Sequence, residues 1–209
     1  MISYIMNGFY INLTKRKDRN THMLSLKESY SFFKNIERID AVYHKNGHIG
    51  CASSHKKALE TCLTKDDDHF LICEDDLCIL NQSKFLHFSE EVSKIINENW
   101  DVIILTPRGD PINENINALF SRINNNQTTT GYVIKKSAIP LLITSLTESI
   151  EHLTKGGHSD LYAFDQYWKR LQKKLRFYYF KKIYAGQLPG HSDIQGGFAD
   201  YNKRYLKQK

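Results

Sequence analysis

The sequence predicts an α/β fold in which a mixed, mostly parallel sheet is flanked by helices, and two observations favour it. Short, apolar, β-branched runs alternate along the chain with segments whose apolar residues recur at helical spacing. The composition is that of a globular protein, with 41% hydrophobic and 25% charged residues among 209. No repeat or linker divides the chain, so we expect a single domain over residues 1–209, with a basic tail from about residue 199.

The first half of the chain alternates regularly between strands and helices. Apolar runs predict strands at residues 8–13, 36–42, 69–73 and 101–105. Hydroxyl residues open a predicted helix at 53–64, whose apolar side carries Ala58, Leu59, Cys62 and Leu63. A second helix is predicted at 83–99, with Phe85, Phe88, Val92, Ile95 and Ile96 at helical spacing.

The second half continues the alternation less regularly. We expect a strand at 131–136, a helix at 137–150 and a late strand at 176–185. A helix is also predicted at 160–172, with an apolar stripe of Leu161, Phe164, Trp168 and Leu171. The asparagine-rich stretch 107–127 is predicted to be a loop.

The sequence also bears on cellular location. No run of about 18 apolar residues is present, so no membrane span is expected. At the N-terminus an apolar stretch precedes a basic one, the reverse of a signal peptide, so a cytoplasmic location is expected. The four cysteines lack the paired spacings of zinc sites and are expected to be reduced, partly buried thiols.

Three adjacent acids, Glu74, Asp75 and Asp76, directly follow the predicted strand at 69–73. In an extended segment Glu74 and Asp76 would share one side and Asp75 would point to the other. Two such carboxylates suit Mg²⁺ or Mn²⁺, which prefer hard oxygen ligands. Ligands of α/β sheets bind beyond the carboxyl ends of strands, which agrees with a site here. A solvated acidic turn is the alternative.

Two other segments could hold an anionic ligand. Gly47 and Gly50 permit a tight turn, and Ser54 and His55 lie at the start of the predicted helix, where backbone donors bind anions. The basic loop at 15–19, which contains Arg16 and Arg19, could hold a diphosphate or ribose. An ordinary capped helix and solvated arginines would account for these segments equally well.

Seven segments, in order, resemble glycosyltransferase family 25, which includes bacterial lipooligosaccharide and collagen galactosyltransferases. They extend from about residue 10 to residue 194 and read "YINLTKRKDR", "GHIGCASSHKKAL", "FLICEDD", "WDVIILTPR", "TTTGYVIKKSAIPLL", "AFDQYW" and "GQLPGHSDI". The chain departs from the family pattern in "LTPRGDP", which lacks the usual Leu-Gly after that strand, and in its asparagine-rich middle loop.

The resemblance implies a GT-A-type, Rossmann-like fold and transfer of a hexose, with galactose expected, from a UDP-sugar with inversion. The implied acceptor is a hydroxyl of a glycan, a lipid-linked oligosaccharide or a protein. It implies that Glu74 and Asp76 hold Mn²⁺ or Mg²⁺, with His191 completing the metal ligands unless it is an ordinary loop histidine. The implied donor-binding residues are Asn12, Leu13, Arg16, Arg19, Gly50, Ser54, His55, Asp75, Thr130 and Gly131.

Asp165 is the expected catalytic base, which takes the proton of the acceptor hydroxyl. It lies one helical turn from both Leu161 and Trp168, so it borders the apolar stripe of the predicted helix. Partial burial of an ionised carboxylate costs free energy, so an acid in that position favours a functional role. The alternative is a surface aspartate paired with Lys169.

The net charge of +6 keeps other functions open. Basic patches could attract phosphates, nucleic acid or an anionic membrane surface. The alternative function is therefore a basic nucleic-acid-binding protein or a metal-dependent nuclease, although no recognised nucleic-acid motif is present and no nucleic-acid partner is expected. A transferase that only binds is a third possibility, against which the intact acids and Asp165 argue.

Overall fold

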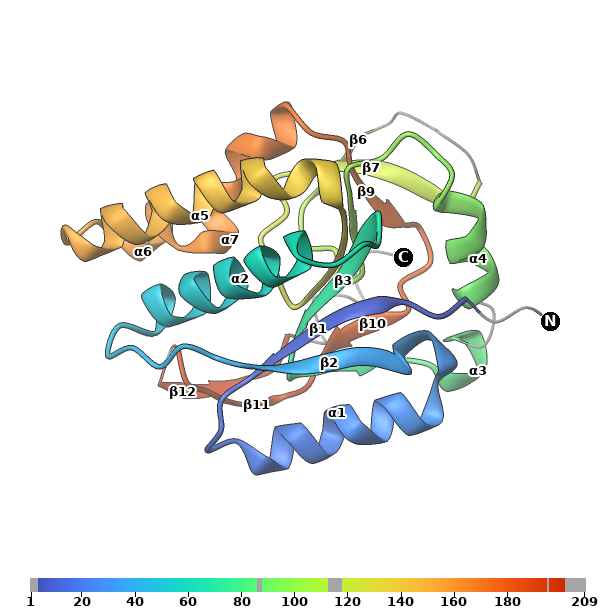
Figure 1. The fold of residues 1–209 in the computed structure, drawn as a ribbon, viewed down its shortest axis with the longest axis horizontal. Helices are drawn as coiled ribbons and strands as arrows, with labels where there is room; N and C mark the ends of the chain where they lie inside the picture. Colours follow the sequence, from blue (N-terminus) through green and yellow to red (C-terminus); the bar gives the residue numbers. More distant parts are fainter. Residues whose placement is uncertain (1–3, 86–87, 113–117, 195, 202–209) are drawn as a thin grey trace.

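An eight-stranded sheet forms the centre of the structure, a computed structural model that describes residues 4–85, 88–112, 118–194 and 196–201 (Figure 1). The strand order is β2-β1-β3-β8-β5-β9-β7-β6. Strands β7 and β8 run opposite to the other six, so the sheet is mixed but most of its strands share one direction. The strands are β1 (Asn7–Asn12), β2 (Asn35–Asp40), β3 (His69–Glu74), β5 (Val102–Ile104), β6 (Asp110–Ile112), β7 (Phe120–Asn124), β8 (Gly131–Lys135) and β9 (Phe177–Phe180).

Helices cover both faces of this sheet. One face carries α1 (Lys17–Ser29), the 3₁₀ turn η1 (Ser31–Phe33), α3 (Gln82–Phe85) and α4 (Phe88–Ile95). On the other face α2 (Gly47–Leu63) and α5 (Ile139–Thr154) lie side by side, as Figure 1 shows. That layer also contains η2 (Lys136–Ala138), α6 (Ser159–Tyr162), α7 (Phe164–Tyr167) and η3 (Trp168–Lys173).

Strand alternation divides the core into two parts. In β3, Phe70 and Ile72 pack towards α2 and α5, whereas Leu71 and Cys73 pack towards α1 and α4. All four side chains are almost fully buried, so β3 carries an unbroken apolar run between two helical layers. The expected α/β class, with a mixed and mostly parallel sheet between helices, is confirmed.

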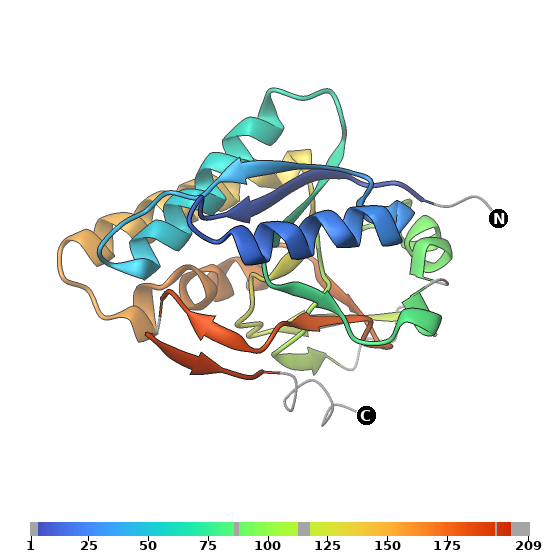
Figure 2. The same ribbon diagram turned by 90° about the horizontal axis from the view of Figure 1, so that it is seen from below.

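Two small sheets lie outside the large one. Strand β4 (Leu77–Ile79) pairs with β10 (Ala185–Gln187), and β11 (Gly190–Ser192) pairs with β12 (Gly197–Ala199). Figure 2 shows these C-terminal strands in orange to red, separate from the large sheet. The β4–β10 pairing brings the C-terminal part of the chain next to the turn that follows β3.

The structure corrects several predicted boundaries. The helix predicted at 53–64 begins at Gly47, because the Asn46 side chain accepts a hydrogen bond from the amide of His48 at 3.0 Å and caps it. Gly47 and Gly50 therefore belong to a helix, not to a tight turn. The helix predicted at 83–99 is divided into α3 and α4, and residues 86–87 between them lie outside the described residues.

The helix predicted at 160–172 is wrong. It is replaced by α6, α7 and η3, because Ala163 has extended backbone angles (φ −57°, ψ 148°) and interrupts the helix. Leu161, which precedes this break in the chain, is 64% exposed, whereas Phe164 and Trp168, which follow it, are buried. The continuous apolar stripe inferred from the sequence therefore does not exist.

The predicted loop at 107–127 contains two strands. Strands β6 and β7 form an antiparallel pair at the edge of the large sheet, and residues 113–117 between them lie outside the described residues. The late strand predicted at 176–185 is the shorter β9, which is followed by an irregular stretch before β10. The basic tail beyond residue 201 also lies outside the described residues.

The four cysteines are unpaired, with Cys51 partly exposed and the other three buried. Among the described residues, no helix combines the length and the apolar character needed to cross a bilayer.

Candidate active site

A cavity of about 260 Å³ lies beyond the carboxyl ends of β1, β2 and β3. Its walls come from the loop after β1, the start of α2, the turn after β3, the segment before β8, the start of α7 and the C-terminal segment around β11. Of the fourteen expected site residues, eleven line it: Leu13, Arg16, Arg19, Gly50, Ser54, His55, Glu74, Asp75, Asp76, Thr130 and Asp165. Asn12, Gly131 and His191 do not.

The three acids after β3 have different surroundings. Glu74 is the last residue of β3, and its Oε1 accepts a hydrogen bond from Thr129 Oγ1 at 2.7 Å. Asp75 and Asp76 are in the turn that follows, where Arg19 Nη1 contacts Asp75 Oδ1 at 2.9 Å and Asp76 Oδ2 at 3.0 Å. The expectation that Asp75 points away from Asp76 is wrong, because the strand ends at Glu74 and its alternation does not continue into the turn.

The Asp76 carboxylate is buried, and its two oxygens differ in their hydrogen bonding. Its Oδ2 also accepts a hydrogen bond from Gln187 Nε2 at 3.0 Å. Its Oδ1 has no hydrogen-bond partner among the described residues. Burial first, and then the negative charge of Glu74, raises the pKa of Asp76 to about 7. An unpaired carboxylate oxygen in a buried acidic pair is a position where a cation would be stabilising.

His55 joins α2 to the acids. Its buried ring places Nε2 3.4 Å from Glu74 Oε1 and Nδ1 3.1 Å from the Tyr132 hydroxyl. Burial alone would raise the pKa of Glu74, but the hydrogen bonds from His55 and Thr129 outweigh it and hold that pKa below its ordinary value. Glu74 is therefore the carboxylate of the pair that keeps its charge.

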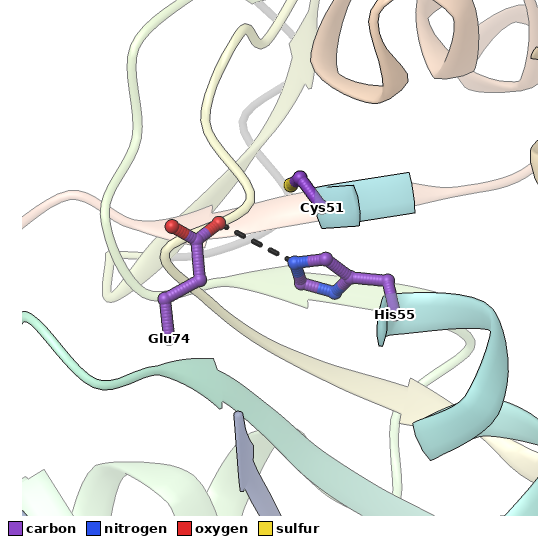
Figure 3. Close-up of side chains that lie close together, drawn as sticks. All are labelled: Cys51, His55 and Glu74. Atoms are coloured by element: carbon purple, nitrogen blue, oxygen red, sulfur yellow. Dashed lines mark hydrogen bonds and ion pairs between the residues drawn. The ribbon is translucent and has the colours of Figure 1, made fainter. Parts of the chain in front are cut away.

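Cys51 lies one turn before His55 on the same side of α2. Figure 3 shows Cys51, His55 and Glu74 pointing towards one another, and one donor atom from each lies within 4.8 Å of the other two. From the sequence, Cys51 is expected only to be a reduced, partly buried thiol. The signal that could have identified it is the four-residue spacing to His55, which places two donors on one helix face.

The basic loop after β1 is ion-paired. Arg16 contacts Asp18 at 2.9 Å and Asp193 at 2.7 Å, and Lys15 also contacts Asp193 at 2.7 Å. Arg19, expected in this loop, lies instead in the first turn of α1 and pairs with Asp75 and Asp76. The arginines are thus not the freely solvated side chains of the alternative interpretation, and Asp193 bridges the loop to the C-terminal segment.

The structure does not bring the His191 imidazole to Glu74 and Asp76. His191 is exposed, and its side chain lies outside the cavity wall formed by its neighbours Gly190 and Ser192. Its backbone oxygen instead accepts hydrogen bonds from Arg16 at 3.4 Å and Arg19 at 3.1 Å. Among the described C-terminal residues, Gln187 is the one whose side chain contacts Asp76.

Several other expected donor-binding residues have their polar groups engaged within the protein. The Ser54 hydroxyl donates to the Gly50 oxygen at 2.6 Å and accepts from the Val42 amide at 2.8 Å. Gly50 allows this close packing, because a Cβ there would lie 2.8 Å from the Val42 oxygen. Asn12 Nδ2 donates to Asp75 Oδ2 at 2.7 Å. Ser54 and Gly50 therefore shape the cavity wall, and Asn12 holds Asp75 in place.

Thr130 directly precedes β8 and Gly131 begins it, next to the acids. The Thr130 oxygen accepts a hydrogen bond from the Glu74 amide at 2.9 Å, which joins the two strand ends. At Gly131 a Cβ would lie 2.8 Å from Leu77 Cδ1, so glycine permits close packing against β4.

Asp165 lies at the start of α7 on the wall of the cavity. Burial first, and then the charge of Glu74, raises the pKa of Asp165 to about 6, while Lys169 and Arg108 oppose the shift. The Lys169 ammonium donates to Gln166 Oε1 at 2.6 Å. Within the described part of the chain Asp165 makes no ion pair with Lys169, so the surface-pair interpretation is wrong.

The family comparison matches the middle of the chain. The model of glycosyltransferase family 25 (LPS biosynthesis protein) matches residues 45–168, which is more than half of the sequence. The chain belongs to glycosyltransferase family 25. The matched region contains Cys51, His55, the three acids after β3 and Asp165, so half of the cavity-lining residues belong to the family region. A search of curated proteins finds no match.

Three solved structures show weak similarity. A mannose-1-phosphate geranyltransferase from Thermus thermophilus aligns at 9% identity and a TM-score of 0.39 over 82% of this chain, which spans 58% of that protein. A glycosyltransferase involved in glycosylation of the major capsid of PBCV-1 aligns at 8% identity and 0.40 over 98% of both chains. A UDP-glucose pyrophosphorylase complexed with UDP-glucose aligns at 12% identity and 0.41 over 94% of this chain and 72% of that one. The family assignment rests on the sequence match and not on these structures.

Proposed function

We propose that this family 25 member transfers a hexose, with galactose as the first candidate, from a UDP-sugar to a hydroxyl of a glycan, a lipid-linked oligosaccharide or a protein. The transfer inverts the anomeric carbon and depends on Mn²⁺ or Mg²⁺. The observation that carries the proposal is the convergence in one cavity of the acids after β3, the basic loop after β1 and Asp165.

The acids fit a hard divalent cation. Asp76 Oδ1 is buried and has no hydrogen-bond partner in the part of the chain that the structure describes, and carboxylate oxygens are the ligands that Mg²⁺ and Mn²⁺ prefer. Glu74 and Asp76 would hold the ion, with Arg19 and Gln187 keeping Asp76 in place. The ion would supply positive charge to the diphosphate that leaves the sugar.

Basic side chains on the cavity wall suit the same diphosphate. Lys15, Arg16 and Arg108 all line the cavity. Lys15 and Arg16 are paired with Asp193. The incoming phosphates would therefore replace the Asp193 carboxylate as the partner of these two side chains. Charge stabilisation of a leaving diphosphate requires cations that are already in place when the bond breaks.

Asp165 is the proposed base on the acceptor side. A raised pKa of about 6 leaves it mostly ionised at neutral pH and still basic enough to accept a proton. It would take the proton of the acceptor hydroxyl as that oxygen attacks the anomeric carbon. Burial of the Asp165 carboxyl group is the main cause of this raised pKa.

The test is UDP or GDP release from a panel of UDP- and GDP-sugars, with and without Mn²⁺. We expect Mn²⁺-dependent release from at least one UDP-sugar, and a loss of about 100-fold or more in Asp76→Asn, as for removal of a group that stabilises transition-state charge. Asp68→Asn is the matched control, because Asp68 is exposed just before the opposite end of β3. Release that is unaffected by Mn²⁺ and by Asp76→Asn would contradict the metal role.

The alternative function is a metal-dependent nuclease, which could use the same acids as metal ligands. The family assignment favours the transferase. Contact with an anionic membrane surface stays a prediction.

A further inference from the structure

Cys51, His55 and Glu74 bring three different metal-binding groups to one wall of the cavity (Figure 3). The first two come from successive turns of α2, and the third comes from the end of β3. Their donor atoms lie within 4.8 Å of one another. In a tetrahedral zinc site the ligand atoms are about 3.5 Å apart, as follows from zinc–ligand bonds of about 2.0–2.3 Å. Small side-chain rotations would therefore bring all three to bonding distance.

The ligands are also supported from outside the cluster. The Tyr132 hydroxyl lies 3.1 Å from His55 Nδ1, which leaves Nε2 directed at Glu74. Thr129 donates to Glu74 Oε1 at 2.7 Å. Partners of this kind orient histidine and carboxylate ligands in metal sites. The rings of Tyr132 and Phe164 lie within 5.8 Å and 5.0 Å of the His55 ring and restrict its movement.

We propose that Cys51, His55 and Glu74 bind a zinc-class divalent cation at a site different from the Glu74–Asp76 pair. A thiolate and an imidazole favour Zn²⁺ or Co²⁺ over Mg²⁺ and Mn²⁺, which prefer oxygen ligands. The cluster supplies three protein ligands and faces the cavity, so a fourth position stays open to water. Binding forms a sulfur–metal bond and releases the thiol proton to solvent.

The two sites share Glu74. A cation held by Cys51 and His55 would draw this carboxylate away from the hard-metal pair, so zinc-class ions would compete with Mn²⁺. This consequence rests on the proposed function, whereas zinc-class binding itself does not.

Binding is tested with Co²⁺ as the probe on the full chain, reduced and freed of metal. We expect one Co²⁺ per chain and a thiolate-to-cobalt charge-transfer absorption. Cys51→Ala, with Cys51→Ser as a second variant, should lose this absorption. Cys78→Ala should keep it, because Cys78 is buried in β4 outside the cluster. Circular dichroism shows that each variant is folded. No charge-transfer absorption in the wild type, or its persistence in folded Cys51 variants, would overturn the site.

Competition is tested by the electron paramagnetic resonance signal of bound Mn²⁺. One equivalent of Zn²⁺ should release Mn²⁺ from the wild type but not from Cys51→Ala. Unchanged Mn²⁺ occupancy in the wild type would show that Glu74 is not shared. Failure of Mn²⁺ to bind in the absence of zinc would instead contradict the proposed function and leave the cobalt result unaffected.

Discussion

Asp165 shows how the position of one side chain sets its chemistry. Asp165 lies in the first turn of α7, just after the helix break at Ala163. Its carboxylate lines the cavity and is not part of the surface of one long helix. Burial and the nearby charge of Glu74 both oppose its ionisation and raise its pKa to about 6. An acid of this kind is a stronger base than an exposed aspartate while still being ionised at neutral pH.

We predict that transferase activity falls as the pH drops through about 6, because a protonated Asp165 cannot accept the hydroxyl proton. A base is active only when it is ionised, so kcat/KM should rise with pH and then reach a plateau. Asp165→Asn should lower kcat by about 10²–10⁴-fold and remove this limb of the pH profile. The measurement is the pH dependence of kcat/KM for both proteins.

The matched control is Asp160→Asn, an exposed aspartate in the adjacent α6. It should leave both the rate and the pH profile as in the wild type. An Asp165→Asn enzyme with wild-type kcat would remove Asp165 from the mechanism.

At the scale of elements, the β11–β12 hairpin depends on ion pairs with a distant loop. Asp193 follows β11 and contacts both Lys15 and Arg16, while the His191 oxygen accepts from Arg16 and Arg19. The hairpin therefore lies against the basic loop that forms one wall of the cavity. Burial alone would raise the pKa of Asp193, but the hydrogen bonds and charges of Lys15 and Arg16 lower it.

We predict that Asp193→Asn loosens this hairpin without unfolding the protein. Partly exposed ion pairs contribute about 0–1 kcal/mol each and Asp193 makes two, so the amides of β11 should exchange with solvent up to about 30-fold faster. Because the folded pKa of Asp193 is lowered, the contribution is complete above its ordinary pKa and is lost as pH falls through the folded value. High salt should reduce the difference between the two proteins.

Hydrogen exchange followed by mass spectrometry measures the effect over residues 188–194. Asp18→Asn is the control, since it removes another partner of Arg16 without touching the hairpin. Equal exchange in wild type and Asp193→Asn would show that backbone contacts, and not Asp193, hold the segment.

At the scale of the whole molecule, burial decided which elements the sequence could predict. Strand β3 is apolar on both faces, so its run of residues is unmistakable, and the acids at its end were found with it. Strand β6 lies at the edge of the sheet and is largely exposed, and β7 beside it mixes buried apolar residues with polar ones, so this stretch reads as a loop. The break at Ala163 depends on backbone angles that no local residue pattern specifies.

The site was predicted as a set of segments but not as a set of contacts. The sequence identified eleven residues that line one cavity, because the ends of parallel strands meet at one edge of a sheet. It could not show that Asp193 neutralises Lys15 and Arg16, because that contact joins segments about as far apart as the chain permits. The association of Cys51 with Glu74 likewise depends on how α2 packs against β3.

Because the cavity walls come from the whole length of the chain, ligand binding should stabilise the whole fold. A ligand present at 100 times its Kd adds about 2.7 kcal/mol to the free energy of unfolding. For a chain of this size that raises Tm by about 5–10 °C. We predict such a shift for UDP with Mn²⁺, measured by differential scanning calorimetry, and a much smaller shift for UDP alone. Asp76→Asn should lose the Mn²⁺-dependent part, whereas Asp68→Asn should keep it. Equal shifts with and without Mn²⁺ in the wild type would mean that the nucleotide binds without the acids.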